Sequence, residues 1–112
     1  MRECLPLYNR TEGDPDTEQR SIWTQEVIEH FSKPGGENWS FDYREELSAI
    51  ACPTLVTAGD IDPITPIAMV KEMASHIPDA VRQLEVFAQC GHGVHRDDPR
   101  AFEVMKKFIA SS

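Results

Sequence analysis

One histidine and a pair of aspartates follow two segments of this chain that have the character of strands. Asp60 and Asp62 come directly after an apolar run at 53–58, and His92 lies in a glycine turn after a second run at 81–88. A neutral imidazole takes up and returns a proton near neutral pH, and a carboxylate on its other nitrogen fixes the tautomer and stabilises the imidazolium. An Asp and a His brought together here could therefore act as a general base.

The two candidate strands are separated by a predicted helix. Thr65 and Pro66 are residues typical of an N-cap and a first helical position. Apolar residues then recur at helical spacing, namely Ile67, Val70, Met73, Ala74 and Ile77. Strands joined through a helix are most simply parallel, and ligands of parallel sheets bind beyond the carboxyl ends of the strands. The sequence thus predicts an α/β unit with Asp60, Asp62 and His92 at one sheet edge.

Three more helices are expected. Asp98 and Pro99 are typical of a helix start, and the apolar face of this last helix consists of Phe102, Met105, Phe108 and Ile109. A short helix is expected at 43–50. One amphipathic helix is predicted over roughly 17–32, with an apolar face of Ile22, Trp23, Val27, Ile28 and Phe31.

Length and charge restrict the class of protein. The chain has 112 residues and a formal net charge of −8, which suits one domain and opposes binding to nucleic acid or to anionic membrane surfaces. The start of the sequence has no apolar signal core, and no stretch is long and apolar enough for a membrane span. The cysteines Cys4, Cys52 and Cys90 are too widely spaced for a zinc motif and fit reduced thiols. We therefore expect a cytoplasmic protein with no nucleic-acid or membrane partner.

The segment 47–66, followed by 91–93 and 98–102, resembles the C-terminal part of an α/β-hydrolase. In that superfamily L-x-x-I-x-x-P-T-L-V leads into G-x-x-D at the end of one strand, and G-H ends the next strand before a final helix. The resemblance covers about residues 44–110. It implies a serine hydrolase of esters or amides, similar to the proline iminopeptidase group, with Asp62 as triad acid, His92 as triad base, and no cofactor or metal.

The first part of the chain resembles the end of the cap that covers the active site of such hydrolases. The predicted division is a helical, cap-like segment at 1–43 and a strand-helix-strand-helix unit at 44–112. The cap or pocket wall would then carry Trp23, Phe31, Trp39 and Phe41. The alternative is that these aromatic residues only anchor a short helix.

An α/β-hydrolase also needs a serine on a G-x-S-x-G elbow, and none of the serines here lies in that pattern. In such hydrolases the nucleophile comes before the cap in sequence, so here it would come before residue 1. We therefore expect a C-terminal hydrolase segment that is inactive alone. Two parallel strands leave apolar side chains uncovered, here Leu55, Val56, Leu84 and Val86. A homo-oligomer, or a partner chain that supplies the rest of the sheet, is expected.

Other interpretations of the same residues stay open. The chain could be a non-catalytic module that self-associates through its sheet edge, and His92 could be a surface histidine bonded to nearby backbone. Cys90 could act as a nucleophile beside His92, because a thiolate needs no elbow. Carboxylates and imidazoles also bind divalent ions, and the candidate ligands are Asp60, Asp62, His92, His95, Asp97 and Asp98. Acidic residues at such turns more often cap helices.

Overall fold

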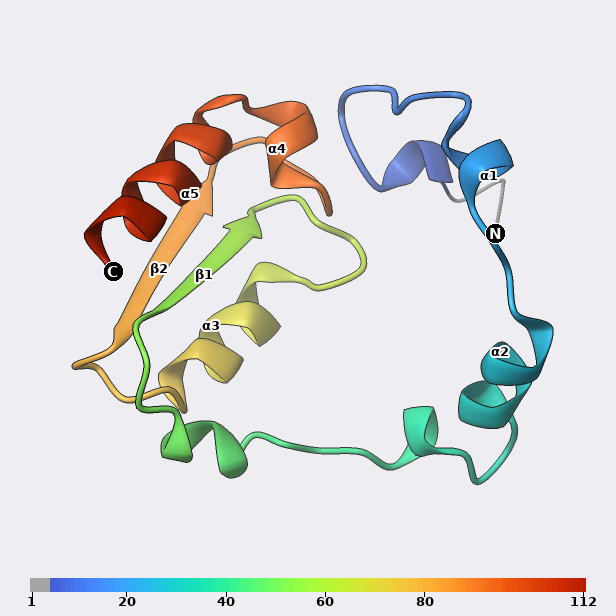
Figure 1. The fold of residues 1–112 in the computed structure, drawn as a ribbon, viewed down its shortest axis with the longest axis horizontal. Helices are drawn as coiled ribbons and strands as arrows, with labels where there is room; N and C mark the ends of the chain where they lie inside the picture. The colour runs from blue at the N-terminus through green and yellow to red at the C-terminus, as the bar shows by residue number, and fades with distance from the viewer. Residues whose placement is uncertain (1–4) are drawn as a thin grey trace.

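The computed structural model describes residues 5–112, so Cys4 lies outside the described residues. Its central feature is a two-stranded parallel sheet (Figure 1). Strand β1 (Thr54–Gly59) pairs with β2 (Arg82–Phe87), and the register runs from Thr54 opposite Arg82 to Gly59 opposite Phe87. The predicted α/β class and the parallel pairing are confirmed.

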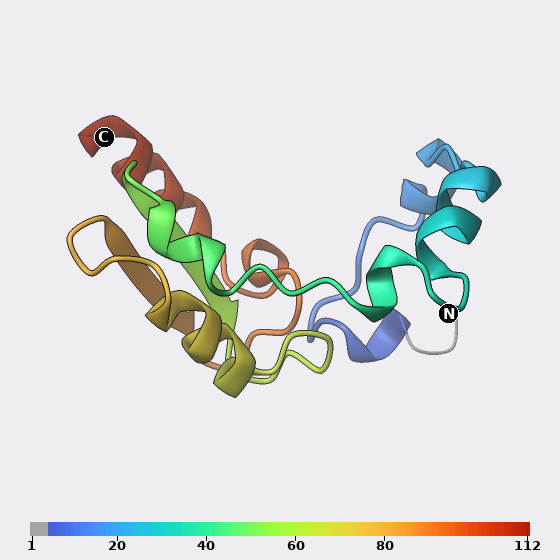
Figure 2. The same cartoon turned by 90° about the horizontal axis from the view of Figure 1, so that it is seen from below.

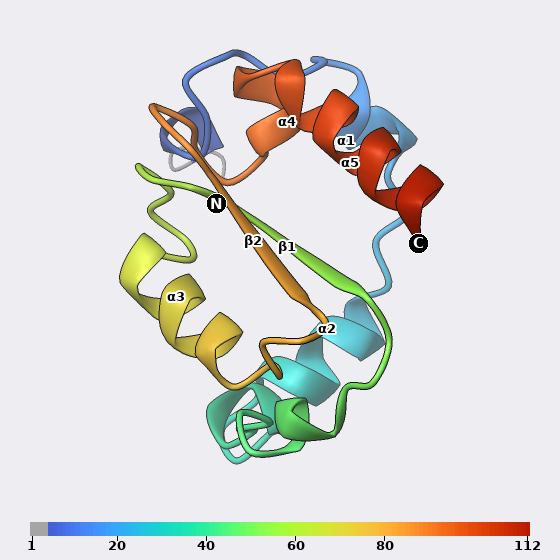
Figure 3. The ribbon, with the colours of Figure 1, turned by 90° about the vertical axis from the view of Figure 1, so that its left-hand side faces the viewer.

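Helices cover the two faces of this sheet. Helix α3 (Ile67–Ser75) lies on one face, and α5 (Arg100–Ser111) lies on the other (Figures 1 and 3). A short helix, α4 (Val94–Asp97), precedes α5 and was not expected from the sequence. The core under α4 and α5 is small, because it consists of Phe87, Cys90, Val94 and Ala101, with Val104 and Met105 packed against it.

The predicted single helix over 17–32 is wrong, because the structure has two helices there. They are α1 (Thr17–Arg20) and α2 (Gln25–Ser32), with Thr24 in an extended conformation between them. Branched and aromatic side chains lose rotamer freedom in a helix, and only packing offsets that loss. Ile22 and Trp23 are 94% and 66% exposed, so no such packing holds a continuous helix together.

Two predicted helix starts have different outcomes. At α5 the N-cap position is Pro99 and not the expected Asp98, but Asp98 still bonds to the helix start, since its Oδ1 accepts a hydrogen bond of 2.9 Å from the backbone N–H of Arg100. Thr65 does not cap α3; Pro66 takes that position, and the Thr65 hydroxyl turns to Asp62 instead. The helix expected at 43–50 is a single 3-10 turn at Glu46–Ala49.

The N-terminal helices lie apart from the sheet and its helices (Figure 2). The two parts are joined by an extended stretch after the 3-10 turn Glu37–Trp39 and by contacts from residues 8–11, including the 3.0 Å hydrogen bond from the Arg10 guanidinium to the Asp97 carbonyl. In the part of the chain that the structure describes, no helix has the length and apolar character to cross a membrane.

Candidate functional site

The turn after β1 holds Asp62 in a bonded, buried position. The Asp62 side chain is 5% exposed. Its Oδ1 accepts hydrogen bonds from the backbone N–H groups of Ile64 (2.7 Å) and Thr65 (3.1 Å), and its Oδ2 accepts one from the Thr65 hydroxyl (2.6 Å). Burial raises the pKa of Asp62, but these donors and His92 outweigh burial and hold the pKa below its ordinary value. Asp62 is therefore a fixed anion at neutral pH.

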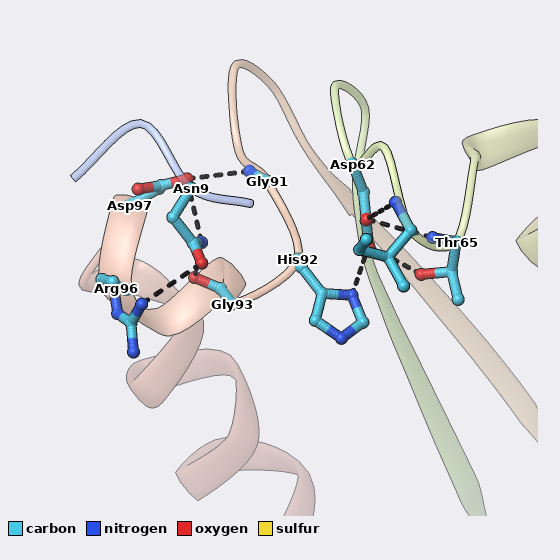
Figure 4. A network of polar contacts seen from close by, with 9 residues as sticks. Asn9, Asp62, Thr65, Gly91, His92, Gly93, Arg96 and Asp97 are labelled. Carbon is cyan, nitrogen blue, oxygen red and sulfur yellow. Dashed lines mark hydrogen bonds and ion pairs between the residues drawn. The ribbon is translucent and has the colours of Figure 1, made fainter. Parts of the chain in front are cut away.

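The turn after β2 brings His92 to that anion. Nδ1 of His92 lies 3.0 Å from Oδ2 of Asp62 (Figure 4). Since the carboxylate can only accept, Nδ1 carries the proton of the neutral ring and Nε2 keeps its lone pair. Figure 4 shows Nε2 directed away from Asp62, and the side chain is 44% exposed. The geometry suits a general base that takes a proton at Nε2.

Asp60, the other acidic residue of the first turn, has a different task. It is exposed, and its Oδ1 accepts a hydrogen bond of 2.6 Å from the backbone N–H of Gln89. Gln89 has a φ of 56°, a strained value for a residue with a side chain. The bond from Asp60 thus ties the two strand-end turns together and supports that backbone conformation.

The position of Cys90 does not suit a nucleophile. The residue is 0% exposed, and its Sγ is 3.4 Å from the carbonyl oxygen of Ala88. Burial and the negative charges of Asp98 and Asp97 raise the pKa of the thiol, which reduces the thiolate fraction. Cys90 is a buried core residue.

The acidic residues expected as alternative metal ligands do not converge. Among residues 5–112 the structure contains no group of three or more His, Cys, Asp or Glu side chains that could hold a metal ion. Asp98 forms an ion pair with Arg100, with 2.6 Å between Oδ2 and Nη2. Asp97 turns inward, away from any such site.

Asp97 is the residue whose role sequence reasoning missed. It is 5% exposed, and its carboxylate accepts hydrogen bonds from the backbone N–H groups of Gly91 (2.8 Å), Arg10 (2.9 Å) and Thr11 (2.6 Å) and from the side chain of Asn9 (3.2 Å). Burial raises the pKa of Asp97, but the four donors hold it well below its ordinary value. Nothing in the sequence signals a bond over so long a separation.

A comparison with protein families fits this arrangement. The sequence model described as the alpha/beta hydrolase fold matches residues 8–99. The chain belongs to the α/β-hydrolase fold family. Among curated proteins, this chain is 37% identical over 59 residues to the proline iminopeptidase of Lactobacillus delbrueckii subsp. lactis, a match that covers 53% of this chain and 19% of that protein.

Two solved structures contain the same arrangement of elements. A structure described as an N-acyl homoserine lactone degrading enzyme matches 73% of this chain at 31% identity, with a TM-score of 0.58, over 31% of its own length. A serine hydrolase involved in carbazole degradation, the CarC enzyme, matches 99% of the chain at 18% identity, with a TM-score of 0.75, over 46% of its own length. The chain therefore has a partial α/β-hydrolase fold and spans less than half of these larger proteins.

Proposed function

We propose that this chain carries the acid and the base of a Ser-His-Asp triad, Asp62 and His92, for ester or amide hydrolysis of the proline iminopeptidase type. The nucleophilic serine would come from polypeptide outside these 112 residues. The observation that carries the proposal is the contact of 3.0 Å between Asp62 Oδ2 and His92 Nδ1 at the carboxyl ends of two parallel strands. Membership of the α/β-hydrolase family supports it.

The proposed roles follow from the positions of the ring nitrogens. Nε2 of His92 would take the proton of the serine as its oxygen attacks the substrate carbonyl, and would return that proton to the leaving group. Asp62 would keep the proton of the neutral ring on Nδ1 and stabilise the imidazolium that forms. The donors around Asp62 maintain its charge at neutral pH. The scheme calls for no metal or cofactor.

The rest of the sheet would also come from outside the chain. Val86 is 43% exposed, while a parallel sheet normally has both faces and its inner edges covered. We propose that a partner chain, or further polypeptide that includes the serine-bearing strands, covers this sheet. Self-association through the same edge, without catalysis, is the second candidate function. Light scattering of the purified chain separates the two, because a discrete dimer favours self-association, whereas a monomer that leaves the sheet edge unpaired favours the missing hydrolase part.

A chimaera tests the catalytic proposal. The 112 residues replace the matching segment of the carbazole-degradation serine hydrolase, which supplies the serine and the remaining strands. We expect hydrolysis of p-nitrophenyl esters and labelling by a fluorophosphonate. Asp62→Asn should lower kcat by about 10⁴-fold and His92→Ala by about 10⁶-fold.

The matched control is His95→Ala, three positions along the same segment, where the imidazole contacts Phe102 with ring centroids 5.5 Å apart and not Asp62. Its kcat should stay within about twofold of that of the unaltered chimaera, since surface substitutions away from the core, the helix caps and buried polar groups have small effects. Full activity of a folded His92→Ala chimaera would exclude His92 as the base. The unfused chain should show no turnover at all.

A further inference from the structure

A segment from the start of the chain lies across the turn that carries His92. We call residues 8–11 the Tyr8 segment; Figure 4 shows it, with Asn9 as sticks, running beside Gly91, Gly93 and Asp97. Asn9 Nδ2 donates to the carbonyl oxygen of Gly93 at 2.9 Å, across 84 positions of sequence. Arg10 Nη2 donates to the carbonyl oxygen of Asp97 at 3.0 Å. The turn is therefore braced by a segment remote in sequence.

Tyr8 makes two direct contacts with His92. Its carbonyl oxygen accepts the backbone N–H of His92 at 2.6 Å. Its ring contacts the imidazole in an edge-to-face arrangement, with centroids 5.8 Å apart and planes at 80°. This geometry stabilises a pair of rings by more than the burial of their surfaces. The first contact holds the backbone of His92, and the second limits rotation of its ring. Together they leave the ring pointing at Asp62.

Asp97 is the anchor of the Tyr8 segment. Its carboxylate oxygens accept hydrogen bonds from the backbone N–H groups of Arg10 and Thr11 and from the backbone N–H of Gly91. One buried carboxylate thus joins the residues that follow Tyr8 to the residue that precedes His92. Gly91 also leaves the space for this approach, because a Cβ there would overlap the Tyr8 carbonyl oxygen.

We propose that Tyr8, anchored through Asp97, is a positioning residue that orients the ring of His92, so that Asp62 can hold the proton on Nδ1. The hydrogen bond between Nδ1 of His92 and Asp62 depends on the orientation of the ring plane. An imidazole free to rotate would lose this alignment. The catalytic consequence rests on the proposed function, whereas the effect on the ring itself does not. The Tyr8 segment lies before the N-terminal helices in sequence, so it also links that part of the chain to the candidate base.

Nuclear magnetic resonance of the full 112-residue chain tests the positioning without any substrate. Long-range ¹H–¹⁵N spectra at about pH 8.5, where an ordinary imidazole is neutral, distinguish a proton on Nδ1 from one on Nε2. In the unaltered chain we expect His92 on Nδ1 alone. Tyr8→Leu and Asp97→Asn should each produce a mixture of tautomers and shift the ring protons of His92, while His30, His76 and His95 keep their resonances.

Two control variants separate positioning from general loss of structure. Tyr8→Phe keeps the ring and the backbone carbonyl, and should restore the His92 spectrum. Tyr43→Leu removes another tyrosine, 60% exposed and stacked on Phe41, and should change nothing at His92. The amide resonances of β1 and β2 report folding in every variant. Unchanged His92 resonances in a folded Tyr8→Leu chain would overturn the proposal.

The chimaera adds a kinetic measurement. Tyr8→Leu should lower kcat about tenfold at unchanged KM, because a misplaced base weakens the transition state and not substrate binding, and Tyr8→Phe should recover it. A rise in KM alone would overturn the positioning role and make Tyr8 part of a substrate wall. His92→Ala decides the proposed function separately, so the two failures are distinguishable.

Discussion

Oδ2 of Asp62 lies 3.0 Å from Nδ1 of His92, although 30 positions separate the two residues. The parallel register of β1 and β2 causes this proximity, because Gly59 lies opposite Phe87 and both strands end at the same edge of the sheet. The backbone N–H of Ile61 then bonds to the carbonyl of Cys90 at 3.1 Å. The two turns are held side by side by backbone, and the side-chain pair follows from that.

The first prediction concerns the hydroxyl that steadies Asp62. Thr65→Val removes the bond of 2.6 Å to Oδ2 and should raise the pKa of Asp62 towards its ordinary value. The free energy of unfolding should fall by about 2 kcal/mol at pH 7, the usual value of a hydrogen bond to a charged group. Urea unfolding followed by circular dichroism measures it.

The pH dependence of this loss has a defined sign. The lowered pKa of Asp62 stabilises the fold above about pH 4, the ordinary range of an aspartate, and this stabilisation disappears as the pH falls through the lowered pKa. The variant and the unaltered chain should therefore converge in acid. Thr24→Val is the control, since that hydroxyl makes no cap hydrogen bond. A difference that persists undiminished at low pH would contradict the assignment.

A second prediction concerns Asp97. Asp97→Asn places an amide donor among four N–H donors, and should cost about 2–4 kcal/mol of unfolding free energy at neutral pH. The amides of Arg10, Thr11 and Gly91 should lose protection from hydrogen exchange first, because they are its backbone partners. Asp98→Asn is the matched control: it keeps an oxygen that can accept the N–H of Arg100 and should leave the protection of those three amides unchanged. Retained protection of those three amides in Asp97→Asn would be incompatible with the anchor.

The third prediction concerns the glycine that precedes His92. In Gly91→Ala the new methyl would overlap the backbone of Tyr8, so the Tyr8 segment should detach and the contact of its ring with His92 should be lost. Gly35→Ala is the control: its φ of 79° costs about 1–2 kcal/mol, but nothing lies within 4 Å of the new methyl. Nuclear Overhauser contacts between Tyr8 and His92 should vanish in the first variant and persist in the second.

The fourth prediction concerns the two described thiols. Cys52 is exposed and Cys90 is buried with a raised pKa, so iodoacetamide at neutral pH should modify Cys52 and spare Cys90. Urea should make both react. Peptide mass spectrometry locates the label. Modification of Cys90 in the folded chain as fast as Cys52 would mean that its core is open.

The strand-helix-strand-helix part of this chain was predictable because its signals are local. Apolar runs that end in Gly59 and in the Gly91 turn, and a helix between them, are enough to predict a parallel pair and to place Asp62 and His92 at one edge. The same local patterns failed where packing is missing. The apolar spacing over 17–32 predicted one helix, but Ile22 and Trp23 contact no core that would hold its middle.

The sequence by itself determined which residues are candidates for the chemistry and the edge at which they lie, since side-chain periodicity and strand order depend on near neighbours. Only the tertiary structure decided how His92 is held. Asp97 binds the Tyr8 segment across 86 to 88 positions, and Tyr8 accepts the N–H of His92. Such bonds follow from two backbones meeting in space, and no spacing or composition along one chain records that meeting.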